Sequence, residues 1–275
     1  MILAEIENLN FSYNLNGKHI LKNLSLNVTE GQRILLAGIN GAGKSTLLRI
    51  LGGKHMAFDI SKFTVLGFRT PQDSIGGVAF VGDNWTQSVS FVGKVAYSID
   101  LPVKHFMRAK QEENIERRNL LCDILKINLD WNMRFLSDGQ RRRVQIMLGL
   151  IHPFKLLLLD EVTSELDIIV RTKLLNFLKK ETEERNASII YATHILDGLD
   201  NWITDIRYIN CHGKIENLND NLDTTPLKKI IVNKMISDYD EMEKNNIIEK
   251  EGQKKEKCKS HGPQGGYSSG RSQNL

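Results

Sequence analysis

Nine consecutive residues near the amino terminus constrain this chain more than any other feature. They complete the pattern G-x-x-x-x-G-K-[ST] and are Gly38, Ile39, Asn40, Gly41, Ala42, Gly43, Lys44, Ser45 and Thr46. The apolar run before them predicts a buried strand over 34–37, and the pattern after them predicts an amphipathic helix over 46–51. Glycines here let successive backbone N–H groups face one concavity, which together with a helix N-terminus holds phosphate oxygens. The sequence therefore predicts a P-loop that binds a nucleoside triphosphate.

Two side chains of this loop carry specific roles. We expect Lys44 to reach the β- and γ-phosphates and the Ser45 hydroxyl to bind Mg²⁺. The alternative is a glycine-rich turn without a ligand. A complete motif between a strand and a helix argues against that alternative.

An acidic pair ends a second apolar run. Four leucines at 156–159 precede Asp160 and Glu161. Such a run suits a central parallel strand covered on both faces, and open α/β sheets bind ligands at the carboxyl ends of their strands. We expect Asp160 to hold the Mg²⁺ and Glu161 to orient or deprotonate an attacking water. A merely solvated acid pair is the alternative, and the P-loop makes it the weaker one.

A third element begins at Ser137. Ser137 suits a helix N-cap, and Asp138 complements the positive end of the helix dipole. One apolar face follows at helical spacing: Val144, Met147, Leu148 and Ile151. The chain thus offers two helix N-termini to anions, although one nucleotide does not need both. A nucleotide sandwiched between two copies of the chain would use each of them.

These residues carry a family resemblance. The segment Leu136-Ser137-Asp138-Gly139-Gln140 resembles the signature of ATP-binding cassette (ABC) ATPases, with Asp138 where glycine is usual. Tyr13, Asp167 and His194 lie where that family has its aromatic loop, D-loop and switch histidine. The resemblance covers about residues 2–218.

The resemblance implies ATP and Mg²⁺ as cofactors and a head-to-tail homodimer that closes on ATP. Tyr13 would stack on adenine, and His194 would contact the γ-phosphate and hold the attacking water. The residues implied to contact ATP outside the P-loop are Tyr13, Ser137, Asp138, Gly139, Gln140 and Asp167.

Further motifs resemble one branch of the family, which includes plant ABC transporter I members and a yeast factor associated with the carbon-catabolite-repression/Not complex. They are 52–56, 136–145, 160–163 and 191–199. Members of that branch have no fused membrane domain, which implies a partner such as that soluble regulatory complex and a cytoplasmic location, with the nucleus left open. A nucleotide-binding subunit serving a separate membrane-spanning chain remains the alternative.

The chain departs from the general family in two places. Val162 stands where proline commonly follows the catalytic glutamate. Asp83 stands where a coupling glutamine is expected after a strand at 78–82, and Gln87 comes four residues later. The second change favours the soluble-complex hypothesis over a transporter subunit.

Composition excludes several other classes of protein. A net charge of +4 and the absence of an aromatic–basic platform give no reason to expect direct nucleic-acid binding. The basic runs 141–143 and 179–180 are interpreted as solvated helix faces. Cys122, Cys211 and Cys258 have no metal-binding spacing and are interpreted as free thiols. No secretory signal is apparent and no stretch approaches the ~18 apolar residues of a membrane helix, so we expect no membrane insertion.

The predicted fold class is α/β, a P-loop NTPase of ABC type whose mostly parallel sheet carries an antiparallel β-subdomain and an inserted helical subdomain. The ATPase domain would span 1–222, with antiparallel strands over 2–28, a turn at 16–17 and the helical insertion over 84–155. That insertion would include a helix over 114–127 with Ile115, Leu120, Leu121, Ile124 and Leu125 on its apolar face. Later elements would be a helix over 167–185, a strand at 189–192, a short helix after His194 and a strand at 206–209. A C-terminal helix is expected over 223–242, and the polar composition of 243–275 predicts a disordered tail.

Overall fold

The computed structural model describes residues 1–14, 17, 19–69, 77–82, 90–91, 94–95, 100–221 and 225–244. Its centre is a six-stranded sheet in the order β11-β10-β3-β9-β8-β5. The strands are β3 (Arg33–Ala37), β5 (Val78–Val81), β8 (Leu156–Asp160), β9 (Ser188–Ala192), β10 (Asp205–Ile209) and β11 (Ile215–Asn217). All adjacent pairs are parallel except β10 and β11. The carboxyl ends of β3, β8 and β9 therefore meet at one edge of the sheet.

Strand β8 is buried on both faces, as its four leucines predict. Leu157 and Leu159 belong to the core on the side of α5 (Asp138–Leu150) and α6 (Ile168–Arg185). Leu156 and Leu158 belong to the core shared with α1 (Lys44–Leu51) and the antiparallel strands. Alternate side chains of a strand point to opposite faces, so one strand holds both cores together.

The predicted antiparallel subdomain is present as a three-stranded sheet, β2-β1-β4. Its strands are β1 (Ile2–Phe11), β2 (Leu21–Thr29) and β4 (Lys62–Val65). Asn16, of the predicted turn, lies outside the described residues.

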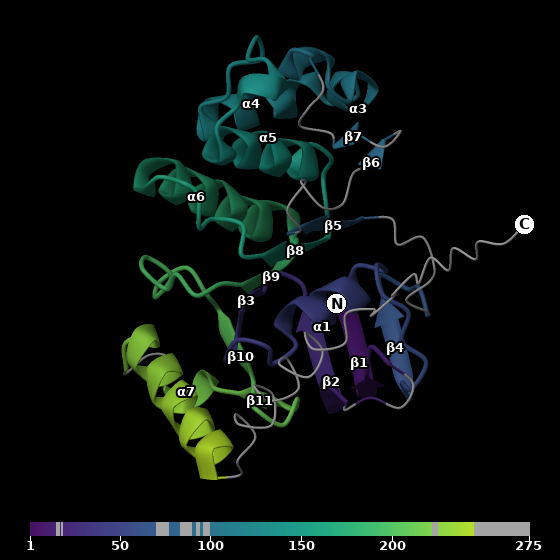
Figure 1. Cartoon of the computed structure of the whole chain (residues 1–275), viewed down its shortest axis with the longest axis vertical. Coiled ribbons are helices and arrows are strands. Elements are labelled where there is room, and N and C mark those ends of the chain that lie inside the picture. The colour runs from purple at the N-terminus through teal and green to yellow at the C-terminus, as the bar shows by residue number, and fades with distance from the viewer. Residues whose placement is uncertain are drawn as a thin grey trace, which may run out of the picture.

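Three helices form a second region at the far end of the molecule from the antiparallel sheet (Figure 1). They are α3 (Arg108–Glu112), α4 (Ile115–Leu125) and α5, with short 3₁₀ turns at Val103–His105 and Met133–Phe135. Between β5 and these helices lie two short antiparallel strands, β6 (Ser90–Phe91) and β7 (Lys94–Val95). Helix α4 packs against α5 and α6, which connects the region to the central sheet.

Two local predictions are wrong. Helix α4 is present, but its predicted apolar face is not the buried one: Ile115 and Leu120 are exposed, and Cys122 is buried. The reason is that α5 and α6 cover only part of the apolar surface of α4. The expected helix after His194 is absent: this segment forms hydrogen-bonded turns at Leu196–Leu199 and Leu199–Trp202. Gly198 adopts a φ of 74°, which interrupts a right-handed helix in so short a segment.

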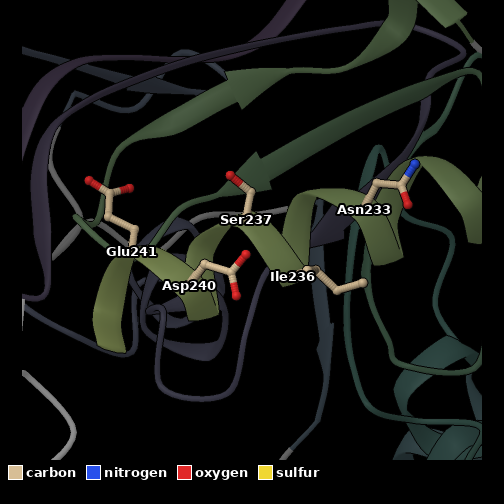
Figure 2. A pocket seen from close by; sticks show the side chains of 5 residues that line it. All are labelled: Asn233, Ile236, Ser237, Asp240 and Glu241. Atoms are coloured by element: carbon tan, nitrogen blue, oxygen red, sulfur yellow. The ribbon is translucent and has the colours of Figure 1, made fainter. Parts of the chain in front are cut away.

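The predicted C-terminal helix is α7 (Leu227–Lys244), which buries Leu227 and Ile231 against the sheet. Its buried Asp238 accepts hydrogen bonds from the Tyr208 hydroxyl at 3.0 Å and the Cys211 N–H at 2.9 Å. A hollow of about 520 Å³ lies along this helix, and Figure 2 shows the five side chains that line it. No helix in the described part of the chain is long and apolar enough to cross a membrane.

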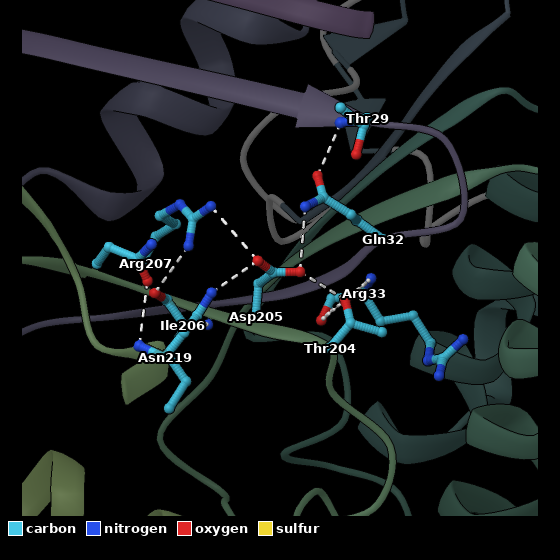
Figure 3. Close-up of polar contacts among 9 residues, drawn as sticks. Thr29, Gln32, Arg33, Thr204, Asp205, Ile206, Arg207 and Asn219 are labelled. Carbon is cyan, nitrogen blue, oxygen red and sulfur yellow. Dashed lines mark hydrogen bonds and ion pairs between the residues drawn. The ribbon is translucent and has the colours of Figure 1, made fainter. Parts of the chain in front are cut away.

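The amino ends of β3 and β10 are joined by a polar network centred on Asp205 (Figure 3). Its carboxylate accepts hydrogen bonds from Gln32 at 3.1 Å, Thr204 at 2.8 Å and Asn219 at 2.8 Å, and lies 3.4 Å from an Arg207 nitrogen. Both carboxylate oxygens are engaged. The network fixes the ends of the two strands at the edge of the sheet opposite the P-loop.

Candidate functional site

The P-loop connects β3 to α1 in the predicted strand–loop–helix arrangement. Its glycines are required by their surroundings: Gly38 has a φ of 150°, and a Cβ there would lie 2.5 Å from the Ile209 carbonyl oxygen. Gly43 is left-handed with a φ of 103°, and a Cβ would lie 2.6 Å from Leu21. A side chain at Gly38 would collide with backbone, and one at Gly43 would have to adopt a left-handed conformation and displace the Leu21 side chain.

Lys44 is the buried cation of this loop, with an exposed fraction of 8%. Its Nζ donates hydrogen bonds to the carbonyl oxygens of Gly38 at 2.7 Å and Ile39 at 3.0 Å. Burial lowers the pKa of Lys44, while the carboxylates of Glu161 and Asp160 act in the opposite direction. The ammonium thus sits in the loop at the point where an anionic phosphate would be held.

The two predicted magnesium ligands lie together. The Ser45 hydroxyl donates a hydrogen bond of 3.0 Å to Asp160 Oδ1. These atoms come from the start of α1 and the end of β8, 115 positions apart in the chain. Hard oxygen donors from a hydroxyl and a carboxylate suit Mg²⁺, so these residues fit the expected ion.

Glu161 and His194 also lie side by side. Glu161 Oε1 lies 3.3 Å from His194 Nε2, and the His194 backbone N–H donates to Glu161 Oε2 at 3.4 Å. Glu161 adopts a φ of 51°, a conformation that costs a non-glycine residue roughly 1–3 kcal/mol. Its own N–H donates to the Ala192 carbonyl at 2.9 Å, so strand β9 holds both this turn and the histidine.

Tyr13 lies at the other side of the loop. Its hydroxyl is 2.9 Å from the Thr46 hydroxyl, and 55% of the residue is exposed. Phe11 and His55 both contact its ring edge-to-face, at centroid distances of 5.2 and 5.6 Å. The sequence gives no role to His55, although it lies in one of the motifs that resemble the soluble branch. Its position shows that it helps to hold the tyrosine ring.

These groups surround one cavity of about 480 Å³. It is lined by Tyr13, Ile20, Asn40, Gly41, Gly43, Lys44, Ser45, Thr46, Asp160, Glu161 and His194. The tyrosine, most of the loop, the acidic pair and the histidine therefore converge on one space. Ser137, Asp138, Gly139, Gln140 and Asp167 do not line this cavity within one chain.

The predicted helix N-terminus at Ser137 is well formed. Ser137 Oγ accepts from the Gln140 N–H at 3.2 Å, and Gln140 Oε1 accepts from the Ser137 N–H at 3.0 Å. This capping box leaves Asp138 at the surface, where its Oδ1 lies 2.9 Å from Arg141 Nη1. A Cβ on Gly139 would approach the Glu165 carbonyl to 3.1 Å. The segment is therefore a rigid, outward-facing helix N-terminus.

The interpretation of 141–143 as a solvated face is wrong for Arg142, which is only 9% exposed. Its guanidinium donates to the carbonyl oxygens of Gly82 at 2.7 Å, Glu161 at 3.2 Å and Val162 at 3.3 Å. Arg142 thereby connects the helix of the signature segment to the ends of β5 and β8. A run of three arginines cannot reveal which one points inward, since that depends on the partner carbonyls.

Asp167 forms the N-cap of α6 and accepts from the N–H groups of Ile169 at 3.1 Å and Val170 at 2.9 Å. Its Oδ2 lies 2.7 Å from Arg143 Nη2. The Val170 hydrogen bond is the main cause that lowers the pKa of Asp167. Within one chain this residue fixes the D-loop segment to the signature helix.

The family model of the ABC transporter matches residues 21–164. The chain is 43% identical over 209 residues to ABC transporter I family member 21 of Arabidopsis thaliana, covering 74% of each protein. It is 35% identical over 230 residues to CCR4-associated factor 16 of Saccharomyces cerevisiae, covering 78% of each.

The chain belongs to the ABC transporter family.

Solved structures agree in fold with this ABC cassette. A dimeric ATP-binding cassette in a post-hydrolysis state, bound to ADP and phosphate, superposes with a TM-score of 0.61 at 22% identity, covering 78% of this chain and 98% of the other. The ATP-binding subunit of an ABC transporter gives a TM-score of 0.68 at 21% identity, covering 84% and 98%. Because it belongs to the family, the protein is an ABC-type ATPase that binds and hydrolyses ATP. Asp83 and Gln87, the candidates for the coupling glutamine, lie outside the described residues.

Proposed function

We propose that this ABC ATPase closes as a head-to-tail homodimer around two ATP·Mg²⁺ and that closure controls the assembly of a soluble regulatory complex. One observation supports the dimer: within one chain, the P-loop cavity and the helix N-terminus at Ser137, both suited to anions, lie apart. The P-loop cavity contains no residue of the signature segment, and that segment forms a rigid N-terminus facing solvent. A second copy supplies the missing half of each site.

Exposed apolar side chains support an interface on this side of the molecule. Phe135 precedes the signature segment and is 76% exposed, and Ile168 and Ile169 follow Asp167 with 77% and 64% exposed. Large exposed apolar side chains next to both the signature segment and Asp167 favour a protein contact there. Ser137, Asp138, Gly139, Gln140 and Asp167 would then face the ATP held by the other P-loop.

Hydrolysis is assigned to the convergent residues of the cavity. Glu161 accepts a proton from water as the water oxygen attacks the γ-phosphorus, and the bond to the β-phosphate oxygen breaks to leave ADP and phosphate. His194 orients the water and the γ-phosphate, and Lys44 neutralises charge on the β/γ-phosphates. Ser45 and Asp160 would hold Mg²⁺, which would supply further charge neutralisation.

Two observations support a soluble partner. One relative is named CCR4-associated factor 16, and this chain matches it over most of its length. Asp83 also replaces an amide by a carboxylate that can only accept hydrogen bonds, so a transporter's coupling helix would meet different chemistry. The second candidate, a subunit serving a separate membrane chain, is favoured by the name of the plant relatives.

We place the protein in the cytoplasm, with the nucleus as a further compartment.

We assign the ATPase to 1–222 with its insertion at 84–155. The C-terminal helical element, predicted over 223–242, continues to Lys244, so the disordered tail predicted over 243–275 is assigned to the residues after α7. Because every site residue lies before 223, the tail is expected to serve partners and to be dispensable for hydrolysis. A chain shortened after Lys244 should keep the full rate of phosphate release. A loss of hydrolysis would show that the tail belongs to the cassette.

Dimer closure is tested with Glu161→Gln, which keeps the shape of the side chain and lacks its basic oxygen. Size-exclusion chromatography with light scattering should give a dimer with ATP and Mg²⁺ and a monomer with ADP. Asp138→Trp in the same background is the matched blocker, because it adds bulk at the interface and leaves the capping box of Ser137 and Gln140 in place. It should bind ATP and stay monomeric. A dimer in this double variant would refute the head-to-tail arrangement.

The partner is tested separately by affinity purification of the tagged chain, with and without Glu161→Gln, followed by mass spectrometry. We expect soluble subunits of a regulatory complex that change in amount with the nucleotide state. Cells are also fractionated without detergent. Recovery of a polytopic membrane protein, together with sedimentation that only detergent reverses, would replace this proposal by the transporter-subunit function.

A further inference from the structure

Three side chains of zinc-binding type converge at the junction of α7 and the β10–β11 turn. Their donor atoms, from Cys211, His212 and Glu241, all lie within 4.8 Å of one another. Glu241 Oε1 is 2.8 Å from His212 Nε2, and Glu241 Oε2 is 3.8 Å from Cys211 Sγ. We propose that this cluster is a Zn²⁺ site that fastens the C-terminal helix to the ATPase core.

The donor set and its dimensions suit this ion. Zn²⁺ takes thiolate, imidazole and carboxylate donors at about 2.0–2.3 Å in tetrahedral geometry, which places neighbouring donors roughly 3.3–3.6 Å apart. The observed 2.8 and 3.8 Å lie on either side of that separation. Because all three donor atoms lie within 4.8 Å of one another, side-chain rotations would bring them around one ion. One sulfur, one nitrogen and one oxygen favour Zn²⁺ over Mg²⁺ or Ca²⁺, which prefer oxygen alone.

The turn that carries two of the donors is fixed before any ion binds. Asn210 Oδ1 accepts from the N–H groups of His212 at 3.0 Å and Lys214 at 3.1 Å, and Asn210 Nδ2 donates to Glu216 at 2.7 Å. At Gly213 the φ is 76°, and a Cβ would lie 2.1 Å from the Ile20 carbonyl oxygen. A rigid turn lowers the entropic cost of placing two donors.

The third donor is aligned by its own helix. Asp238 accepts from the Cys211 N–H, and Glu241 lies three residues later on the same side of α7. Figure 2 shows Glu241 and Ser237 extending from one side of the helix, away from Asp240 and Ile236. Glu241 also lines the hollow of about 520 Å³, which gives an ion an open route from solvent.

The electrostatic surroundings favour a cation. The carboxylates of Asp238 and Glu241 lie beside Cys211: Asp238 accepts from its N–H at 2.9 Å, and Glu241 Oε2 lies 3.8 Å from its Sγ. The same carboxylates attract a divalent ion, which would displace the thiol proton to solvent as the metal–sulfur bond forms. Cys211, His212 and Glu241 supply three donors, so water would take the fourth position of a tetrahedral site.

The proposed Zn²⁺ site lies beside the P-loop. A cavity of about 360 Å³ is lined both by Cys211 and His212 and by Asn40, Gly41 and Ala42 of the P-loop. An ion holding α7 against the turn therefore stabilises one wall of the space beside the phosphate-binding backbone. This inference concerns α7 and does not depend on dimer closure or on the soluble partner.

The full-length chain, stripped of metal, is titrated with Co²⁺ as a spectroscopic substitute for Zn²⁺. We expect a near-ultraviolet sulfur-to-cobalt charge-transfer band that Zn²⁺ abolishes by displacement. An ion in the P-loop site, with oxygen donors, gives no such band. Cys211→Ser should remove the band, and Glu241→Gln should weaken Zn²⁺ binding in equilibrium dialysis more than about 100-fold, since even outer-shell changes cost 10–100-fold.

Two cysteine variants serve as controls. Cys122→Ser alters a buried thiol in the helical region, and Cys258→Ser alters the thiol of the tail; both should keep the band. Thermal melting without metal checks that each variant is folded, and Zn²⁺ should raise the melting temperature of wild type but not of Cys211→Ser. A band that survives in folded Cys211→Ser, or a wild-type chain with neither band nor retained zinc, would overturn the proposal.

Discussion

The two edges of the central sheet use acidic residues in opposite ways. At the amino edge, Asp205 engages both carboxylate oxygens with groups from the chain itself. At the carboxyl edge, Asp160 accepts from the Ser45 hydroxyl, and Glu161 Oε1 makes no hydrogen bond among the described residues, with His194 Nε2 lying 3.3 Å away. Buried polar atoms are normally satisfied, so the carboxyl edge carries an energetic cost that the amino edge does not.

The difference separates a structural acid from a ligand-binding one. A saturated carboxylate such as that of Asp205 has no acceptor capacity left for a substrate or an ion, whereas the unsaturated Glu161 beside a buried cation is ready to exchange partners. Parallel strands place helix N-termini and loops at the carboxyl edge, which explains why ligand-binding groups gather there. Substitutions of the same chemical kind at both edges test this comparison.

The largest effect is expected from Glu161→Gln. Loss of the basic oxygen should lower the rate of ATP hydrolysis by about 10²–10⁴-fold. ATP affinity should change little, because Lys44 and the backbone of the loop are untouched. Phosphate release and equilibrium binding of a fluorescent ATP analogue measure the two quantities. The matched control is Asp205→Asn, an equal acid-to-amide change at the amino edge, which should hydrolyse ATP within about twofold of wild type per folded molecule. Equal losses of activity in both variants would show that the two acids do not differ in role.

Lys44→Ala should have the next largest effect, on binding itself. Charge-assisted hydrogen bonds contribute about 1.5–3 kcal/mol each, so ATP affinity should fall on the order of 10–100-fold. Lys62→Ala provides the control, since Lys62 forms a surface ion pair with Glu5 at 2.7 Å, away from the cavity. Titration with the fluorescent analogue decides the point: unchanged affinity in Lys44→Ala would remove this residue from the site.

Asp205→Asn should instead lower the free energy of unfolding. The amide keeps the shape but exchanges two acceptor oxygens for one, which should cost about 1–3 kcal/mol in this part-buried network. Urea denaturation followed by circular dichroism measures the loss. Glu183→Gln, at a half-exposed residue on α6, should change stability by less than about 0.5 kcal/mol. An Asp205→Asn variant with the same free energy of unfolding as wild type would show that the hydrogen bonds of Asp205 do not stabilise the fold.

The smallest effect concerns pH and Asp167. The Val170 hydrogen bond is the largest cause that lowers the folded-state pKa of Asp167. The ionised carboxylate therefore stabilises the fold above its unfolded pKa of about 3.9. This stability is lost as the pH falls through the lower pKa of the folded state. Asp167→Asn retains an N-cap oxygen and lacks the charge. Its melting temperature should therefore depend less on pH below about 4 than that of wild type. Asp167→Ala, which also removes the cap, should be less stable at neutral pH as well; identical acid profiles for wild type and Asp167→Asn would contradict the assigned cause.

The candidate site residues could be predicted from the sequence because their motifs are local. The P-loop needs a strand, glycines and a helix start in one continuous segment, and the Ser137 capping box joins residues three positions apart, so each can be recognised in one stretch of chain. The leucines of β8 likewise predict burial on both faces. Periodicity was less informative for α4, because an apolar pattern does not tell which of its residues a neighbouring helix will cover.

The sequence alone predicts the ABC cassette, its phosphate loop and the identities of the acids and the histidine, since each of these motifs lies in one continuous segment. Their convergence, as of Ser45 and Asp160 across 115 positions, depends on the order of the strands. Tertiary structure alone decided which arginine of 141–143 turns inward, that Gln32 and Asp205 meet across 173 positions, and that Cys211 and His212 face Glu241. These contacts join elements that are distant in the chain. Their partners are set by strand order and helix packing, which no local pattern of residues encodes.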